Sequence, residues 1–385
     1  MTSAAPRVHF PRDDGFHEDL KARAEAWLAR TGKRATGDAA MKAKTATIFA
    51  WHLGAYALLL ALGPGAPLLS AALVLSLALS TVGIGFAIMH DANHGSWSGR
   101  RFVNRVVGLS LDAIGGSSYV WRHKHNVRHH TYANIEGLDA DLEAEPFLRL
   151  APGQRRRAWH RFQHLYAWPI YGFLAPKWWL VDDAKDLLTG RIGQVAFPRP
   201  PAGELALAVL GKVFFLTWSL AVPLLVFRTP WVLAYWFGGA MVAGVVLAVV
   251  FQLAHVVPAA EFHAAGEPGR KMPTGWAEHQ VRTTVDFAPG SPLLTWYLGG
   301  LNYQVVHHLL PMYCHVHYPA LAGIVAETCR DHGIPYRSEP TLLGALRGHG
   351  RLLRNLGRPL VSGAAARPLR SGLTEELGTA EERAV

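Results

Sequence analysis

The chain has 385 residues, of which 50% are hydrophobic and only 17% are charged, so it is too apolar for an ordinary soluble domain of this length. Its formal net charge of +10 must lie outside the lipid, where it can meet anionic head groups or acidic proteins. Nucleic acid is not an expected partner, because no basic module stands apart from the apolar stretches.

Residues 1–44 form a polar and charged N-terminal segment. No apolar stretch in it precedes a cleavage site of small residues, so we expect no removable signal peptide. We expect this segment to lie in the cytoplasm.

Four stretches are long and apolar enough to span a bilayer, since a helix needs about 20 residues to cross ~30 Å of hydrocarbon. They are residues 45–62, 68–89, 205–227 and 231–253. The turns at 63–67 and 228–230 are too short to carry a domain, so the stretches form two hairpins. The sequence therefore predicts an all-α integral membrane protein with four transmembrane helices in two hairpins.

Lysine and arginine residues indicate which side of the membrane the longer segments occupy. The short turns hold almost none, whereas the other side carries Lys42, Lys44, Arg100, Arg101, Arg155, Arg156, Arg157 and Arg191. That side is expected to be cytoplasmic, and the membrane the inner (plasma) membrane if the source is bacterial. The hairpins then occupy residues 45–253 with a cytoplasmic insertion at 90–204. Residues 254–365 complete a cytoplasmic helical domain.

Three smaller features complete the expected organisation. Residues 161–179 mix aromatic and charged side chains as an interfacial helix does, although a solvent-facing helix packed on the cytoplasmic domain is the alternative. Residues 366–385 are small and charged without apolar periodicity, which predicts a disordered tail. Cys314 and Cys329 form no CxxC pair, and we interpret both as buried, reduced structural residues.

Histidine clusters carry the clearest functional signal among the 20 histidines of the chain. Each cluster lies on the predicted cytoplasmic side, near the end of a span. In the first and second clusters, spacing i and i+4 puts two rings on one helix face. In the third, a glutamine that could supply an oxygen ligand precedes two histidines at i+3 and i+4. The clusters are His90 and His94; His125, His129 and His130; Gln304, His307 and His308; and the lone His255.

Eight histidines are too many for one tetrahedral zinc ion, which takes four ligands, and their number suits two metal ions. Imidazole ligands also suit iron. The alternative is that each pair only hydrogen-bonds a carbonyl or a head group. The coincidence of all four clusters on one side favours the two-metal site.

Nearby polar residues are candidates to hydrogen-bond the ligands, because metal-bound imidazoles commonly donate their other N–H to a carboxylate. Asp91, Asp139 and Asp141 are the best of these, with solvated surface aspartates as the alternative for Asp139 and Asp141. His315, like His123 and His317, falls outside the cluster pattern and is given a supporting or structural role. We expect no catalytic side chains beyond the metal ligands.

At these residues the chain resembles the membrane fatty acid desaturase superfamily, whose three histidine boxes and lone histidine have this order and spacing. The likeness extends from residues 16–20 to residues 309–319. Residues 121–141 resemble the bacterial acyl-CoA (linoleoyl-CoA-type) branch, and Gln304 at the head of the third box is shared with front-end desaturases. The resemblance implies a di-iron centre whose ligands are His90, His94, His125, His129, His130, His255, His307 and His308.

Two positions depart from the animal-type acyl-CoA desaturases. Those enzymes have histidine where this chain has Gln304. They also have asparagine, which holds a metal-bound water, where this chain has Phe251, followed by Gln252. The resemblance therefore does not specify whether Gln304 binds iron or whether that water site is kept.

The implied activity is oxygen-dependent desaturation of a fatty acyl chain, carried on CoA or on a lipid, with two iron ions and O2 as co-substrate. The electron donor is expected to be another protein, such as a ferredoxin or a small haem protein, because the chain lacks a His-Pro-Gly-Gly motif and a GxGxxG after a strand. A hydroxylase or ketolase with the same centre is the nearest alternative. A non-enzymatic membrane haem or metal carrier is a more distant one.

Overall fold

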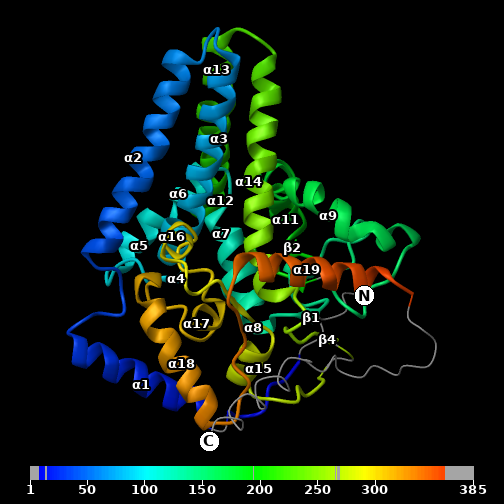
Figure 1. Cartoon of the computed structure of the whole chain (residues 1–385). Coiled ribbons are helices and arrows are strands. Elements are labelled where there is room, and N and C mark those ends of the chain that lie inside the picture. The colour runs from blue at the N-terminus through cyan, green and yellow to red at the C-terminus, as the bar shows by residue number, and fades with distance from the viewer. Residues whose placement is uncertain (1–7, 14, 194, 265, 267–268, 360–385) are drawn as a thin grey trace, which may run out of the picture.

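The structure is a computed structural model that describes residues 8–13, 15–193, 195–264, 266 and 269–359. Four long helices form one end of it, and shorter helices gather at the other end (Figure 1). The predicted disordered tail at 366–385 lies outside the described residues. The all-α expectation is confirmed, because the described residues contain only three pairs of strands, and each strand is two residues long.

Four helices are long and apolar enough to cross a membrane, as the sequence predicts. They are Ala39–Leu62, Pro67–His94, Ala202–Phe227 and Trp231–His255. Both hairpin turns lie at the same end, at the top of Figure 1. The helices extend beyond the predicted spans by two to six residues at the end away from these turns. The predicted spans were shorter because polar residues continue each helix past its apolar part.

Two of these helices contain wider π-helical turns. The second consists of α3 (Pro67–Gly83), a π-helical segment (Ile84–Met89) and α4 (His90–His94). The third consists of α12 (Ala202–Leu216), a π-helical segment (Thr217–Ala221) and α13 (Val222–Phe227). The first and fourth, α2 (Ala39–Leu62) and α14 (Trp231–His255), are α-helical throughout. A π-turn inside a helix changes the direction in which the following side chains project, and in the second helix these include His90 and His94.

Small residues let α3 and α14 pack closely, as is typical of membrane helices. Ala78 on α3 and Ala240 and Ala243 on α14 belong to one buried apolar cluster. A Cβ atom at Gly239 would lie 2.8 Å from a methyl group of Val74. The half of α14 nearer the hairpin turn is thereby packed against the second span.

The helices at the other end come from all parts of the sequence. They are α1 (Phe16–Thr31), α5 (Arg101–Gly108), α6 (Ser110–Ala113), α7 (Ser118–Trp121), a π-helix (Arg122–His129), α8 (His130–Tyr132), α9 (Gln163–Gly172), α10 (Leu174–Lys177), α11 (Asp183–Thr189), α15 (Trp276–Arg282), α16 (Pro292–Tyr297), α17 (Gln304–Leu309), α18 (Tyr318–Asp331) and α19 (Leu342–Gly357). A π-helical turn (Trp178–Asp182) joins α10 to α11, and 3-10 turns occur at Ala140–Leu142, Ala158–Phe162 and His315–His317.

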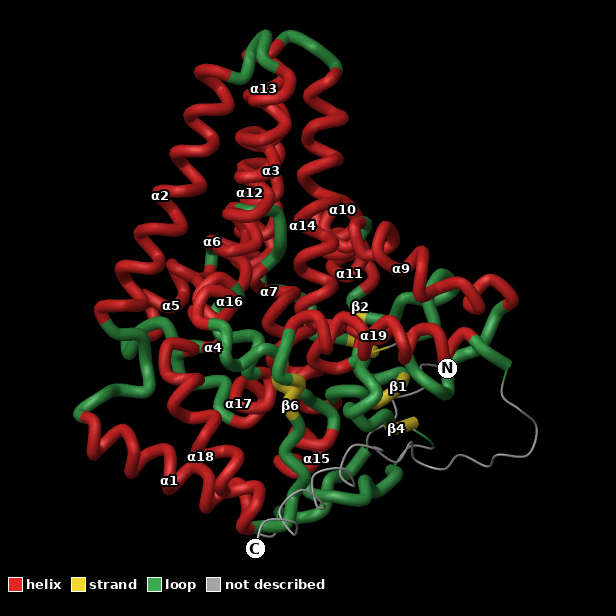
Figure 2. Tube along the Cα trace, viewed as in Figure 1, coloured by secondary structure: helices red, strands yellow, loops and turns green. Residues whose placement is uncertain are grey.

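Two of the three strand pairs in the described residues join segments that are distant in sequence (Figure 2). β1 (Ile135–Glu136) runs parallel to β4 (His263–Ala264), and β5 (Asp286–Phe287) runs parallel to β6 (Ser338–Glu339). The third pair, β2 (Arg191–Ile192) with β3 (Val195–Ala196), is a local antiparallel turn. The parallel pairs hold the segments after α14 and after α18 against the rest of this half.

The predicted interfacial segment at 161–179 forms α9, α10 and the start of the π-turn that follows. One face of α9 packs on α14 so closely that a Cβ atom at Gly244 would lie 2.0 Å from the carbonyl oxygen of Gly172. On this segment Phe162, Leu165 and Phe173 are exposed. The interfacial position of these exposed side chains stays a prediction. Cys314 and Cys329 are both free and buried, as expected.

Candidate metal centre

Five segments bring the predicted histidines to one place below the long helices. α4 carries the first pair, the π-helix Arg122–His129 and α8 carry the second cluster, α17 carries the third, and the last residue of α14 is His255. None of the eight histidines is more than 7% exposed. The eight are His90, His94, His125, His129, His130, His255, His307 and His308.

The histidines form two sets. The ligand nitrogens of the first set all lie within 4.8 Å of one another, and the same holds for the second set. The ring of His130 lies between the two, with its centroid 4.5 Å from that of His307 and 4.6 Å from that of His308. The first set is His90, His94, His125 and His307, and the second set is His129, His255 and His308.

The second cluster shows the expected neighbours and one further contact. Spacing i and i+4 predicts that His125 and His129 lie together, and their rings stack with centroids 5.3 Å apart, in a group that also includes Asp141. Nε2 of His125 also lies 3.2 Å from Nε2 of His130. The reason is that Arg122–His129 is a π-helix, in which residues i and i+5 lie one above the other. His129 consequently takes its place in the second set, while His125 belongs to the first.

The ring nitrogens fit a pair of metal ions. Among the eight histidines, four have a buried Nε2 with no hydrogen-bond partner within the described residues, namely His90, His94, His255 and His308. Nε2 of His125 also lies 3.4 Å from Nε2 of His307, so ring nitrogens of separate segments converge there. A buried polar atom without a partner costs about 1–3 kcal/mol, a cost that metal coordination removes.

Burial also sets the protonation state that metal binding needs. It lowers the pKa of His125, His130, His307 and His308 well below the usual value, because the charged ring would lose its hydration. These rings are therefore neutral at physiological pH. Metal ions bind the neutral imidazole, so no proton has to be displaced from these four rings.

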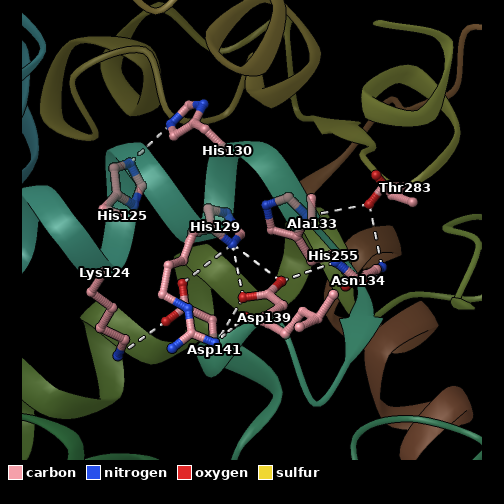
Figure 3. A network of polar contacts seen from close by, with 12 residues as sticks. Lys124, His125, His129, His130, Ala133, Asn134, Asp139, Asp141, His255 and Thr283 are labelled. Carbon is pink, nitrogen blue, oxygen red and sulfur yellow. Dashed lines mark hydrogen bonds and ion pairs between the residues drawn. The ribbon is translucent and has the colours of Figure 1, made fainter. Parts of the chain in front are cut away.

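Asp139 supports His129, as the sequence predicts (Figure 3). Nδ1 of His129 lies 3.1 Å from one carboxylate oxygen of Asp139, which is only 1% exposed. Although burial opposes protonation of His129, the carboxylates of Asp139 and Asp141 raise its pKa. Asp139 also accepts hydrogen bonds from the backbone N–H groups of Asn134 and Asp141. It is therefore a buried anchor for the ligand ring, and the surface alternative is wrong for this residue.

Asp141 has a mixed environment. One oxygen lies 3.5 Å from Nδ1 of His129, and the other forms an ion pair with Lys124 at 3.1 Å (Figure 3). The side chain is 26% exposed. Burial opposes ionisation, but Lys124 and His129 outweigh it and lower the pKa of Asp141. Asp141 thus contacts the second set from its edge.

Three further supporting contacts were not predicted. Nδ1 of His255 lies 3.2 Å from the carbonyl oxygen of Thr283, and Nδ1 of His308 lies 2.9 Å from the side-chain oxygen of Gln280. Each of these Nδ1 atoms donates, which leaves Nε2 as the free acceptor. Nδ1 of His307 lies 3.2 Å from the hydroxyl of Tyr318. The partners lie 11 to 28 residues away in sequence and form no motif with the histidines, so spacing alone could not identify them.

Asp91 and His315 form a supporting contact at the first set. Asp91 is 1% exposed, and its oxygens lie 3.5 Å from Nδ1 of His90 and 2.8 Å from Nδ1 of His315. His315 therefore reaches the first set through Asp91. The predicted structural role of His123 and His317 agrees with their positions: His123 faces the carbonyl oxygen of Tyr119, and His317 packs against Trp27.

Gln304 is the first residue of α17 and is 1% exposed. Its amide nitrogen has no hydrogen-bond partner in the described part of the chain. Its role as an oxygen ligand stays a prediction. At the other departure from the animal-type pattern, the ring of Phe251 lies 6.3 Å from that of His125, and the side-chain oxygen of the neighbouring Gln252 is buried without a partner.

Comparisons with known proteins agree with this geometry. The family model for fatty acid desaturases matches residues 66–340. The sn-1 linoleoyl-lipid 6-desaturase of Arthrospira platensis is 38% identical over 360 residues, covering 92% of this chain and 96% of that protein. The enzyme of the same name from Synechocystis is 35% identical over 356 residues, covering 92% and 99%.

A third relative is a longer protein, and the match covers only part of it. The acyl-lipid (8-3)-desaturase of Physcomitrium patens is 38% identical over 278 residues, which cover 71% of this chain and 58% of that protein. The matched region of the family model contains all eight histidines and Gln304. The chain therefore belongs to the fatty acid desaturase family and is a membrane enzyme that introduces double bonds into fatty acyl chains.

Proposed function

We propose that the enzyme desaturates an acyl chain carried by a membrane glycerolipid, with two iron ions in its histidine sets and O2 as co-substrate. The observation that carries this proposal is the convergence of eight buried imidazoles on two adjacent points, with His130 beside both. Their number and type suit iron. The similarity to enzymes named as lipid desaturases supports a lipid-borne substrate over acyl-CoA.

The assignment of ligands follows the two sets. One iron is held by His90, His94, His125 and His307, the other by His129, His255 and His308, and His130 is within reach of either. Gln304 offers a further oxygen. Contacts at the Nδ1 atoms orient several of these rings. They are made by Asp91, Asp139, Asp141, Gln280 and Thr283. Such partners orient ligands and raise their basicity.

The chemistry requires a metal because an alkyl C–H bond has no proton that a side-chain base can remove. When bound, the iron pair supplies the oxidising power, drawn from O2, that removes two hydrogens from adjacent carbons. The protein's own residues hold the acyl chain in place and exclude bulk water. Burial of all eight histidines is consistent with that exclusion.

The proposed topology puts the centre in the cytoplasm. The two hairpin turns hold one arginine, Arg228, and no lysine, whereas the opposite end carries the basic residues that the positive-inside rule places in the cytoplasm. Residues 1–44, 90–204 and 254–365 are then cytoplasmic, with the hairpins of 45–253 in the inner membrane of a bacterium.

An acidic electron carrier, such as a ferredoxin or a small haem protein, is the proposed donor. Four arginines at intervals of three or four residues form an exposed row along α19, and no acidic partner for them is found in the described residues. They are Arg347, Arg351, Arg354 and Arg358. Arg156 donates a hydrogen bond to the carbonyl of Gly357 at 2.8 Å, so the predicted patch at Arg155–Arg157 adjoins this row. Opposite charge would steer the donor there.

The decisive experiment is expression in a host with simple lipids, with new double bonds located by mass spectrometry and iron measured on the purified protein. The proposal expects a new double bond in lipid-linked chains and close to two irons per chain. A hydroxylated product would assign the alternative activity instead. One metal per chain, or zinc in active enzyme, would refute the iron pair.

A further inference from the structure

A cleft of about 450 Å³, lined by charged and apolar groups, adjoins the first histidine set. Its wall includes His94, and three arginines line it, namely Arg101, Arg105 and Arg122. Its volume lies within the roughly 300–1,000 Å³ typical of small-molecule sites. A site of this kind beside the centre can hold the part of the substrate that does not react.

The charges in the cleft leave an excess of positive charge. Glu204 pairs with Arg105 at 2.7 Å and with Arg122 at 3.3 Å. Arg122 also donates a hydrogen bond to the side-chain oxygen of Asn93. Arg101 is exposed and has no acidic partner among the residues described. One glutamate therefore faces three guanidinium groups, which leaves room for an anion.

The position of the cleft relative to the long helices indicates where this anion comes from. Ala92 and His94 end the second membrane helix, and Glu204 lies in the first turn of the third, so the cleft lies where two apolar helices end. On α5, beside the cleft, Phe102 is 78% exposed and Val106 is 51% exposed. Exposed apolar residues next to arginines at the end of a span are typical of the lipid head-group level.

We propose that this cleft binds the phosphodiester head group of the glycerolipid whose acyl chain is desaturated. Arginine recognises phosphate by paired charge-assisted hydrogen bonds, and a single anionic phosphodiester suits the modest charge excess better than a group with several phosphates. An uncharged sugar head group would leave Arg101 without an anionic partner. Because His94 borders the cleft, a bound head group also brings the carboxyl end of the acyl chain closest to the centre.

This inference rests on the proposed function, and direct binding tests it separately. The purified full-length protein is mixed with equal amounts of phosphatidylglycerol and monogalactosyldiacylglycerol that carry the same acyl chains. Native mass spectrometry then counts the lipid retained by the protein. We expect phosphatidylglycerol to be preferred about tenfold, the order expected for one charge-assisted contact.

Matched variants locate the preference. Arg101→Gln should abolish it, Arg101→Lys should keep much of it, and Arg100→Gln should leave it unchanged because the exposed Arg100 does not line the cleft. Equal retention of both lipids by the wild type would overturn the inference. A preference that survives in Arg101→Gln would overturn it as well.

Two additional measurements separate this inference from the proposed function. Addition of acyl-CoA in the same assay should not displace phosphatidylglycerol, and displacement that depends on Arg101 would assign the cleft to CoA instead. Analysis of double bonds in the same lipids gives the second separation. Selective binding without any new double bond in either lipid would refute the proposed function but support head-group binding in the cleft. Desaturation of both lipids without selective binding would support the proposed function but refute head-group binding in the cleft.

Discussion

The ammonium nitrogen of Lys44 lies 2.7 Å from Nε2 of His315 in the interior of the protein. Lysine can only donate, so Nε2 of His315 accepts and its Nδ1–H donates to Asp91 at 2.8 Å. The other oxygen of Asp91 faces Nδ1 of His90 at 3.5 Å, which leaves Nε2 of His90 free for a metal ion. Lys44 thus sets the tautomer of His315, at the start of a series of contacts that reaches a candidate ligand.

Removing that cation should weaken metal binding at the first set. Lys44→Met leaves Nε2 of the buried His315 without its donor, a loss that typically costs about 1–3 kcal/mol. We expect the iron content to fall toward one per chain while the protein stays in the membrane. Lys42→Met is the matched control, because Lys42 is exposed on the same helix. Full iron content in Lys44→Met would show that this series of contacts does not position His90.

Loss of any one candidate ligand from either set should abolish turnover. His94→Ala affects the first set, and His129→Ala, His255→Ala or His308→Ala affects the second. The variants should still insert, since the long apolar helices satisfy their own backbone hydrogen bonds without metal. Iron analysis and product analysis on membrane fractions measure both effects. His123→Ala, whose ring belongs to neither set, should stay active, and activity in two of the four variants would show that the ligands are misassigned.

Gln304 distinguishes two physical accounts. If its amide oxygen binds iron, Gln304→His supplies a nitrogen from the same position of α17 and should retain two irons and measurable desaturation, whereas Gln304→Ala should lose activity or one metal. If Gln304 only orients a neighbour, alanine should keep both irons and histidine should do no better than alanine. Iron content and double-bond position in the two variants decide between these accounts. Wild-type behaviour in both would exclude either role.

Asp286 should make stability depend on pH. Burial raises the pKa of this carboxyl to about 7, although it accepts hydrogen bonds from the backbone of Val305 and the hydroxyl of Tyr336. Between about pH 4 and pH 7 the folded protein holds a proton that the unfolded chain lacks, so this contribution to stability is lost as the pH rises. The melting temperature should therefore fall from pH 5 to pH 8.

Asp286→Asn should reduce that fall, because the amide does not ionise and can still bond both partners. Differential scanning fluorimetry of the detergent-solubilised protein at the two pH values measures it. Asp331→Asn, at an exposed carboxylate paired with Arg23, is the control and should keep the wild-type slope. A slope in Asp286→Asn equal to that of the wild type would assign the pH dependence to another group.

Charge reversal on α19 should slow electron delivery. Arg351→Glu with Arg354→Glu replaces two exposed cations of the proposed donor surface, so an acidic donor should reduce the enzyme more slowly, with a weaker dependence on salt. Stopped-flow reduction with purified donor measures the rate. Arg30→Glu, an exposed site on α1, should leave it unchanged. Unchanged reduction with altered membrane binding would assign the row to lipid head groups.

The sequence predicted the hairpins and singled out the eight histidines that the structure brings together, because span length and histidine spacing are local properties. It did not predict that His125 also approaches His130, because the sequence does not distinguish an α-helix from a π-helix, which brings residues i and i+5 together. The sequence also did not predict the contacts of Gln280 with His308, of Thr283 with His255 and of Lys44 with His315. These residues approach the histidines only through tertiary packing, which a single sequence does not specify.

Neighbouring residues on one backbone turn serve different sets: His307 belongs to the first and His308 to the second. His129 and His130 are adjacent in the same way, with His130 beside both sets. A metal ion that orders one ring of such a pair therefore restricts the backbone of the other. Ordering entropy lost on filling the first position need not be lost again at the second. In the wild type the two positions should therefore be coupled in loading, so protein that holds a single metal ion should be a minor species when both positions are intact.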